Sequence, residues 1–305
     1  MKLIDNFDRL YCNLKYDKQG NLLIGVKHSI VRMLCRKVSN AVLPVYLRLS
    51  HNTEYHKVEH NVILSLTSFP LRIGKLWMVI ESLLLQTVRA EKIIVWLSKE
   101  QFPDMNSVPQ SILRYNTEGV EVRLVDGDIR SHKKYHYMVN EFPESMFVTL
   151  DDDILYPSHM LEELLEANVK YPHAVIARYA YEMKYEESGV IRSYSEWKRV
   201  MYPQKPSSKF FFGSGGGTLF PIGSLHSDVK NIDLAMRLCP TADDVYLNAQ
   251  CRRNKTQIAV VDKNVALLNV QYKEDKRLAT DNVDSGNAND VQIANINAYY
   301  KEKIF

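Results

Sequence analysis

The chain has 305 residues, of which 46% are hydrophobic and 25% are charged, and its formal net charge is +3. This composition is that of an ordinary globular protein, and the small net charge gives no reason to expect a nucleic-acid binder. The four cysteines lie far apart without a C-x-x-C pair, which argues against a cysteine zinc site and suits a reducing, cytoplasmic setting. No apolar run reaches the roughly 20 residues of a membrane-spanning helix. We expect no secretory signal, because the first residues lack an apolar core.

Basic residues are concentrated near the start of the chain. Residues 1–60 hold ten Lys/Arg and five Asp/Glu, a net charge of +5, so the remainder has a net charge of −2. Within residues 25–49, apolar side chains recur at helical spacing: Ile30, Met33, Leu34 and Val38. This pattern predicts a basic amphipathic helical extension over residues 1–60. Its helix either contacts an anionic membrane surface, such as the inner face of the cytoplasmic membrane, or packs on its own domain or a partner chain.

From residue 61 onward, short apolar runs alternate with helical patterns. The predicted strands lie, in chain order, within residues 61–70, 92–98, 120–125, 146–150 and 174–181, and the predicted helices within residues 73–86, 131–142 and 157–171. This alternation predicts an α/β, Rossmann-like fold with a mostly parallel central sheet and helices on both faces. In such sheets, ligands bind beyond the carboxyl ends of the strands. We also expect Ser158 to cap the helix that begins near it.

Three consecutive aspartates, Asp151, Asp152 and Asp153, directly follow the predicted strand 146–150. Adjacent like charges repel, and a divalent cation is a common reason for placing them together. Mg²⁺ and Mn²⁺ prefer oxygen ligands, and Mg²⁺ is often held by one or two carboxylates plus substrate phosphates. The alternative is a solvated acidic loop, which the apolar residues on both sides disfavour. The sequence therefore predicts a metal–diphosphate site at the end of this strand.

Two later segments supply further candidates. Residues 210–221 carry four glycines within five positions, which lets backbone N–H groups approach a ligand closely unless the segment is a plain wide turn. Further on, we expect Thr241 to cap a helix that begins with Asp243 and Asp244, where the helix dipole keeps a carboxylate ionised. An ionised carboxylate in a cleft can take the proton of a hydroxyl as a general base. The alternative is that both aspartates only cap the helix.

Cations are needed if the leaving group is a nucleoside diphosphate, because they stabilise its developing charge. The segment after the third predicted strand supplies four candidates: Arg130, His132, Lys133 and Lys134. A helix N-terminus there adds its own N–H groups. We choose Lys134 and Arg72 for nucleotide contacts. Asp126 or Asp128 is the candidate for the base or ribose, and for each of these residues alone a solvated surface charge is the alternative.

The order of these motifs resembles that of family 2-type nucleotide-sugar glycosyltransferases with the A fold. A strand, the D-x-D triplet, an apolar pair and a proline that opens a helix are similar to the D-x-D region of that family. VILSLTSFP, a helix ending in LLLQT, and KIIVWLS are similar to its opening unit, and the likeness covers roughly residues 61–255. The resemblance implies Mn²⁺ or Mg²⁺ and a nucleotide-diphosphate sugar as donor. It also implies a glycan or lipid-linked acceptor, as in surface polysaccharide biosynthesis, and inversion at the sugar carbon.

The resemblance further implies roles for single residues. Asp151 and Asp153 correspond to the outer carboxylates that face the ribose and the metal, and Asp152 belongs to the same site without a role of its own. The later acidic pair corresponds to the catalytic pair of the family, with Asp244 as the base and Asp243 as the second choice. The expected contacts to the nucleotide and donor are made by Thr67, Arg72, Asp126, Lys134, Gly215 and Gly216.

The likeness has one departure. Many metal-dependent members have a histidine after the acidic pair that completes metal binding, whereas none of the nine histidines here lies beyond His226. An Asn or Asp from residues 281–290 is the remaining candidate for that ligand. We predict a catalytic domain at residues 61–265 and a segment at residues 266–305 that packs on or closes the site, with a helix from about Asp290.

Two other functions stay open. Haloacid-dehalogenase-type phosphohydrolases also place a D-x-D after an apolar strand, but Thr or Val usually stands where Leu155 is, and their motif closes the first strand of the core. A non-catalytic glycan-binding subunit of the same fold could stack sugars on some of the 18 tyrosines. Such a subunit has no use for both acidic groups.

Overall fold

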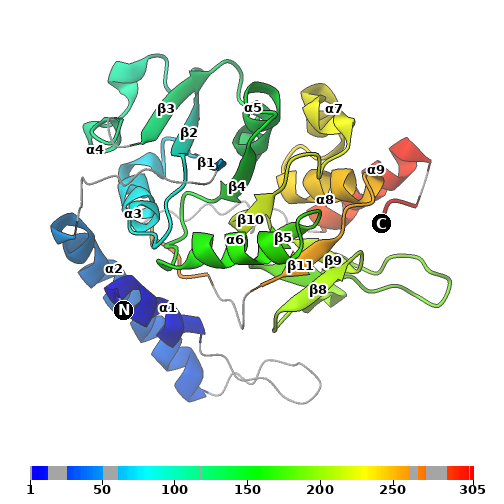
Figure 1. The fold of residues 1–305 in the computed structure, drawn as a ribbon, viewed down its shortest axis with the longest axis horizontal. Coiled ribbons are helices and arrows are strands. Elements are labelled where there is room, and N and C mark those ends of the chain that lie inside the picture. The colour runs from blue at the N-terminus through cyan, green and yellow to red at the C-terminus, as the bar shows by residue number, and fades with distance from the viewer. Residues whose placement is uncertain are drawn as a thin grey trace.

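The computed structural model describes residues 2–12, 26–50, 61–116, 119–261, 267–272, 287–301 and 303–305. Within these residues, the main sheet has eight strands in the order β3-β2-β1-β4-β10-β5-β11-β8 (Figure 1). They are β1 (Val62–Thr67), β2 (Lys92–Ser98), β3 (Val120–Val125), β4 (Met146–Leu150), β5 (Val175–Ala177), β8 (Gln204–Ser207), β10 (Gly216–Phe220) and β11 (Ile258–Val260). β10 is antiparallel to β4 and β5, and β8 is antiparallel to β11, whereas the other neighbours are parallel. The predicted α/β fold with a mostly parallel sheet is confirmed.

Helices cover both faces of this sheet because its strands are apolar on both sides. Along β1, Val62, Leu64 and Leu66 belong to one core, and Ile63 belongs to the other. The first core includes side chains of α3 (Ile73–Leu84), α4 (Gln110–Leu113) and α6 (Met160–Lys170). The second includes side chains of α5 (Lys133–Glu141), α7 (Ile232–Leu238), α8 (Asp243–Arg253) and α9 (Ala288–Tyr300). The prediction of helices on both faces is therefore also confirmed.

The predicted N-terminal helical extension is present as α1 (Leu3–Cys12) and α2 (Val26–Leu49), which pack side by side at one side of the molecule (Figure 1). Ile4 of α1 and Leu43 and Leu47 of α2 join the first core. The carboxylate of Asp5 accepts hydrogen bonds from Ser158 N at 2.7 Å and Ser158 Oγ at 2.9 Å, which fixes α1 to the start of α6. Because these helices share the core of the sheet, the division of the chain near residues 60 and 265 stays a prediction.

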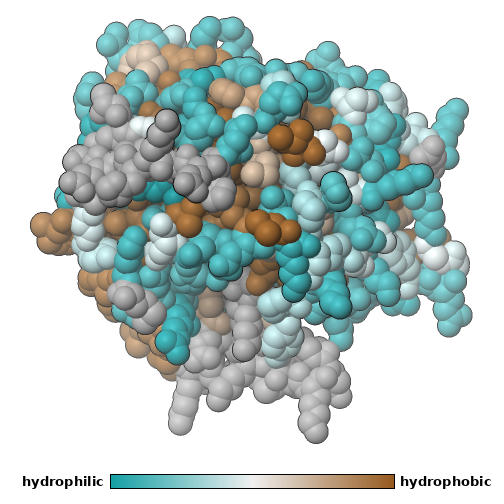
Figure 2. Space-filling view, viewed as in Figure 1, coloured by the Kyte–Doolittle hydropathy of each residue, from teal (hydrophilic) through white to brown (hydrophobic). Residues whose placement is uncertain are grey.

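The outward face of α2 is apolar. Figure 2 shows hydrophobic side chains along the edge of the molecule where Figure 1 places this helix. The large hydrophobic side chains exposed on it are Ile30, Val31, Met33, Leu34, Val38, Val42, Val45 and Leu49. The inner face consists of Cys35, Ser39, Leu43 and Leu47 instead. The predicted apolar periodicity is therefore real, but it marks the exposed face. In the part of the chain that the structure describes, no helix is both long and apolar enough to cross a membrane.

Two predicted helix caps are wrong. Ser158 donates to Asp5, and His159 occupies the N-cap of α6 without a side-chain hydrogen bond. At α8 the N-cap is Ala242, and Thr241 Oγ1 instead accepts a hydrogen bond from Gln292 Nε2 of α9 at 3.0 Å. In both cases a partner distant in the sequence takes the side chain that local geometry would use for capping.

The second half of the chain forms a smaller sheet beside the main one. The predicted strand 174–181 is divided into β5 and β6 (Ala180–Glu182), and β6 lies between β7 (Lys198–Arg199) and β9 (Phe210–Phe212). The predicted glycine loop is shorter than expected, because Gly216 already belongs to β10 and only residues 213–215 turn between β9 and β10. The described residues also contain short 3₁₀ helices: η1 (Met105–Ser107), η2 (Arg130–His132), η3 (Tyr194–Glu196) and η4 (Ser227–Lys230).

A late segment, residues 267–272, connects the acidic triplet to α2. Val270 N donates to Asp153 O at 2.7 Å, and Leu155 N donates to Leu268 O at 2.9 Å. On the other side of the segment, Asn40 of α2 donates to the carbonyl of residue 269 at 3.0 Å and accepts from the N–H of residue 271 at 2.8 Å. The backbone that follows β4 is therefore held by residues more than a hundred positions later in the chain.

Candidate active site

A cavity of about 770 Å³ lies where β1 and β4 end and α8 begins. This is the edge at which parallel sheets bind ligands. All predicted site residues except Asp126 line the cavity: Thr67, Arg72, Lys134, Asp151, Asp152, Asp153, Gly215, Gly216, Asp243 and Asp244. Segments from both halves of the chain therefore meet in one cavity.

Asp126, the candidate for the base or ribose, is not among the residues that line this cavity. Its side chain is 89% exposed and pairs with Lys99 at 2.9 Å. The alternative, Asp128, does line the cavity. Asp128 accepts hydrogen bonds from Gln101 Nε2 at 2.7 Å, from Arg130 N at 3.0 Å and from Lys133 Nζ. Burial raises the pKa of Asp128, but its contacts with Lys133 outweigh burial and bring the pKa below its usual value, so this carboxylate is ionised.

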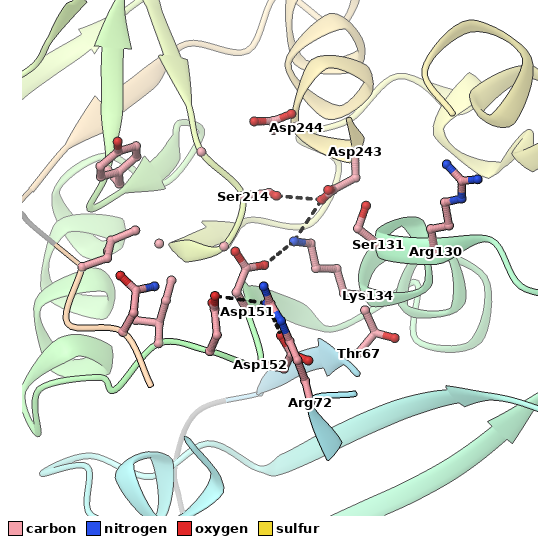
Figure 3. Close-up of a pocket in the computed structure, with 18 of the residues that line it drawn as sticks. Thr67, Arg72, Arg130, Ser131, Lys134, Asp151, Asp152, Ser214, Asp243 and Asp244 are labelled. Carbon is pink, nitrogen blue, oxygen red and sulfur yellow. Dashed lines mark hydrogen bonds and ion pairs between the residues drawn. The ribbon is translucent and has the colours of Figure 1, made fainter. Parts of the chain in front are cut away.

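Lys134 lies between the two acidic groups. Its ammonium is 2.8 Å from Asp151 Oδ1 and 3.1 Å from Asp243 Oδ2, and only 3% of its side chain is exposed (Figure 3). Burial lowers the pKa of Lys134, but the two carboxylates together raise it above its usual value. The ammonium is therefore charged and joins the end of β4 to the start of α8.

The backbone of Lys134 is fixed from the sheet. Ser65 Oγ of β1 donates to Lys134 O at 2.6 Å and accepts from Trp96 Nε1 of β2 at 2.9 Å. Lys134 lies in the first turn of α5, where a rigid backbone directs its side chain toward the strand ends. The hydrogen bond from Ser65 fixes the backbone of Lys134, and the two carboxylates fix its ammonium.

The three aspartates after β4 have different partners. Asp151 contacts Lys134, whereas Arg72 Nη1 lies 3.0 Å from both Asp152 Oδ1 and Asp153 Oδ2. Ser68 Oγ donates to Asp152 Oδ2 at 2.6 Å. Burial raises the pKa of Asp152, and Arg72 opposes that rise. The mutual repulsion of the triplet is thus offset by two protein cations, one on each side.

These contacts assign a role to Asp152 that the sequence did not reveal. Its side chain is 8% exposed, against 43% for Asp151, so it points into the protein and not into the open part of the cavity. It holds the guanidinium of Arg72 together with Asp153. Asp152 is therefore an anchor for Arg72, and Asp151 is the most accessible carboxylate of the triplet.

Asp243 and Asp244 begin α8, but their surroundings differ. Asp243 is bound by Lys134 and accepts a hydrogen bond from Ser214 Oγ at 2.6 Å. Burial raises the pKa of Asp243, but Lys134 and the hydrogen bond outweigh it and bring the pKa below its usual value. Asp244 accepts from Val245 N at 2.9 Å and forms no ion pair with any described residue. Burial and, next, the charge of Asp243 raise the pKa of Asp244 to about 7.

Gly215 and Gly216 have no room for a side chain, because neighbouring atoms lie too close to the backbone. A Cβ at Gly215 would lie 1.7 Å from Asp151 Oδ2, and a Cβ at Gly216 would lie 2.6 Å from Tyr179 Cβ. Gly215 O also accepts a hydrogen bond from Tyr156 OH at 2.6 Å, and the same hydroxyl accepts from Asp151 N at 2.8 Å. The glycines therefore let the turn pack directly against the triplet.

Several residues of the cavity were not predicted as site residues: Tyr11, Arg32, Ser68, Tyr179, Tyr181, Tyr194, Arg199 and Ser214. Tyr179 and Tyr181 lie among the last three residues of the predicted strand 174–181, so its carboxyl end was a usable signal. Nothing local in the sequence distinguishes Arg199 or Tyr194, which a hairpin brings to the cavity.

The expected third metal ligand stays a prediction. Residues 281–286 lie outside the described residues, Asp290 binds Ser193 Oγ at 2.6 Å, and Asn289 lines the cavity. In the described part of the chain, no three or more His, Cys, Asp and Glu side chains form a group that could hold a metal ion.

No family model and no curated protein sequence matches this chain. Among solved structures it is similar to the crystal structure of S. aureus TarS 1-349, with 13% sequence identity and a TM-score of 0.46. The match covers 68% of this chain and 59% of that chain, so the present chain spans less than two thirds of the TarS fragment. At this TM-score the likeness carries no argument about function.

The contact at Gly215 generates a prediction. In Gly215→Ala the new methyl group displaces the Asp151 carboxylate and breaks its contact with Lys134. We expect a loss of about 1–3 kcal/mol in the free energy of unfolding, measured by urea denaturation. Gly74→Ala is the matched control, because a Cβ there meets no atom within 4 Å. We expect that variant to be at least as stable as the parent, since alanine favours a helix over glycine. Equal stability of Gly215→Ala and the parent would contradict the packing described above.

Proposed function

We propose that this chain is a metal-dependent, inverting glycosyltransferase that moves a sugar from a nucleoside-diphosphate donor to a glycan or lipid-linked acceptor in surface polysaccharide biosynthesis. One observation carries the proposal. A single cavity contains an acidic turn at the end of β4 and, beyond Lys134, a second carboxylate, Asp244, that forms no ion pair with any residue that the structure describes. The first group suits a diphosphate with its counter-ion, and the second suits a general base. Family resemblance of the motifs agrees with this division.

Asp244 is the proposed base. Its pKa of about 7 lets it be ionised near neutral pH and still accept a proton in the reaction. The acceptor hydroxyl transfers its proton to the Asp244 carboxylate as its oxygen bonds to the anomeric carbon. The bond from that carbon to the donor phosphate oxygen breaks, and its electron pair leaves with the nucleoside diphosphate. Asp243 is unsuited to this role because Lys134 and Ser214 already occupy it.

The leaving diphosphate needs cations. Some cations of the cavity form ion pairs with aspartates, and another forms none with any described residue. Lys134 uses two of its three N–H donors on Asp151 and Asp243, which leaves one for a phosphate oxygen. Arg72 is bound to Asp152 and Asp153. Arg130 lines the cavity without an ion pair to any described residue, and its φ of 52° is a strained conformation outside glycine. We therefore add Arg130 to Lys134 and Arg72 as a candidate for the diphosphate contact.

The residues fit a metal ion that is held mainly by the substrate. Asp151 presents the most exposed carboxylate of the triplet, and Asp153 adjoins it. Mg²⁺ and similar ions commonly take one or two carboxylates and fill the remaining positions with water and substrate phosphates. Asp151 and Asp153 would hold the ion, which would supply Lewis-acid stabilisation of the leaving diphosphate.

This assignment predicts metal-dependent nucleotide binding. In a thermal-shift panel of nucleoside diphosphates, we expect one nucleotide to raise Tm only when Mn²⁺ or Mg²⁺ is present. Saturation at about 100 times Kd corresponds to about 2.7 kcal/mol of stabilisation. Asp151→Asn should remove the metal-dependent part, and Asp233→Asn, an exposed residue of α7, should not. A panel without any response would contradict the donor class, and hydrolysis of small phosphomonoesters without a nucleotide would favour a phosphohydrolase.

The base assignment predicts the pH dependence of sugar transfer. Since Asp244 must be ionised, kcat/KM should fall as the pH drops below about 7. Asp243→Asn removes the neighbouring negative charge, lowers the pKa of Asp244 and should shift this acidic limb to lower pH. Asp244→Asn should lower kcat by about 10²- to 10⁴-fold with the nucleotide thermal shift retained. If the Asp244→Asn variant transferred sugar at the parental rate, this result would contradict the role of Asp244 as the general base.

We also propose that α2 rests on an anionic membrane surface, with the chain on the cytoplasmic face. The apolar stripe on α2 is flanked by the exposed cations Lys37 and Arg48, and α2 carries no Asp or Glu. This combination suits a helix lying in the headgroup region of a bilayer. Tyr11 of α1 and Arg32 of α2 line the catalytic cavity, so the same helices would bring the cavity close to a lipid-linked acceptor.

Membrane contact through α2 is tested by vesicle co-sedimentation. The parent should sediment with vesicles containing phosphatidylglycerol, less so at high salt because ionic attraction is screened. Val45→Glu and Leu49→Glu replace side chains that are 60% and 82% exposed and should abolish sedimentation. Val169→Glu is the control, because Val169 is 81% exposed on α6, away from this stripe. Loss of a dimer in Val45→Glu, with no vesicle binding by the parent, would show that a second copy covers the stripe instead.

A further inference from the structure

One wall of the cavity is built from aromatic rings and one arginine. The phenol oxygens of Tyr179 and Tyr181 are 2.6 Å apart, and the rings of Tyr181 and Tyr194 have centroids 5.3 Å apart. Arg199 lies opposite Tyr181 in the pairing of β6 with β7, and its guanidinium stacks on the Tyr179 ring at 4.5 Å. All four side chains line the cavity. The small sheet and η3 thus contribute a wall that the proposed mechanism does not use.

Arg199 and Arg32 differ from the other enclosed cations of the cavity, because each has a buried guanidinium nitrogen without a hydrogen-bond partner among the described residues. Arg72, Lys133 and Lys134 each form ion pairs with aspartates. Arg199 forms no ion pair and no hydrogen bond with any described residue, and its buried Nη2 has no partner. A guanidinium has five N–H donors and no acceptor, so burying one without a partner is costly. The missing partner is therefore an acceptor group from outside the described protein, and a negatively charged one fits best.

The position of this wall indicates which substrate it faces. Burial and then Tyr181 raise the pKa of the Tyr194 phenol, and the Asp244 carboxylate adds to that rise, which places Tyr194 near Asp244. Tyr179 packs against the glycine turn, since a Cβ at Gly213 would lie 2.9 Å from its ring. Arg72 and the triplet are held on the other side of Lys134 (Figure 3). Through Tyr194, the wall therefore reaches the side of the cavity on which the proposed base lies.

We propose that Tyr179, Tyr181, Tyr194 and Arg199 form the acceptor subsite, and that the acceptor carries a phosphate or carboxylate group that Arg199 binds. This inference rests on the proposed function, because it takes Asp244 to mark the acceptor side. Tyrosine rings stack on the apolar faces of sugars, and their hydroxyls bind sugar hydroxyls. The planar guanidinium of Arg199, fixed on Tyr179, matches a two-oxygen anion such as a carboxylate or phosphate. The acceptor class is accordingly an anionic glycan or glycan phosphate.

The acceptor subsite is tested by ligand-observed NMR titrations of the full chain. The titrations contain saturating nucleoside diphosphate and Mg²⁺ but no Mn²⁺. The probes are methyl β-glucuronide, glucose 6-phosphate and the neutral methyl β-glucoside. We expect one or both anionic probes to bind at least about tenfold more tightly than the neutral probe, and Arg199→Gln to remove that preference. Arg199→Lys keeps the charge without the planar fork and should restore it only in part. Comparison of the two anionic probes distinguishes a carboxylate from a phosphate acceptor.

Arg192→Gln is the control, because Arg192 is an exposed residue paired with Glu196 at 3.1 Å on the surface before β7. It should bind the probes like the parent. Equal binding of all probes to the parent and Arg199→Gln, or displacement of the anionic probes by the nucleoside diphosphate, would overturn the acceptor subsite. The nucleotide thermal shift of Arg199→Gln reports separately on folding and on the donor site. Normal nucleotide binding with no anion preference therefore refutes this inference alone, whereas absent nucleotide binding in the parent refutes the proposed function.

Discussion

The ammonium of Lys134 holds the site together. It is buried between Asp151 and Asp243, 2.8 Å and 3.1 Å away, and so joins the strand end of the first half to the helix start of the second. A buried charge is tolerated only when it is paired, so the enclosed ammonium of Lys134 needs its two carboxylates. Because Lys134 forms an ion pair with Asp243 and not with Asp244, it also distinguishes the two adjacent aspartates, and the second is the one that we propose as the base. The proposed base catalysis on one side of the cavity and the proposed diphosphate binding on the other depend on this arrangement.

Close packing of the glycine turn sets the shape of the cavity around that lysine. Gly215 allows Asp151 to approach the backbone, and Gly216 allows Tyr179 to lie beneath β10. Tyr179 in turn supports the guanidinium of Arg199. The two walls of the cavity, acidic on one side and aromatic on the other, are thus spaced by the turn of residues 213–215 and the first residue of β10. A side chain in this turn would disturb both walls at once.

The N-terminal helices connect the cavity to the molecular surface. Their inner side chains join the core of the sheet, and Tyr11 and Arg32 reach the cavity. The outer face of α2 keeps a stripe of exposed aliphatic residues. The inner apolar face of α2 is buried against its own domain. The outer apolar face is exposed, and we propose that it contacts a membrane surface, which would bring a lipid-linked acceptor close to the cavity.

Sequence periodicity by itself determined the α/β class, the strands β1 to β4 and the position of the acidic groups at strand and helix ends, because these features depend on local alternation and on residue type. The helix caps, the division of 174–181 between two sheets and the partner of each aspartate required the tertiary structure. Asp5 competes for Ser158, Gln292 competes for Thr241, and Arg72 selects Asp152 over Asp151, all from distant positions in the chain. Arg199 and Tyr194 reach the cavity only through a hairpin whose register no local pattern specifies. The sequence marks where charge is placed along the chain, and the fold decides which of those charges are neutralised and which stay free to react.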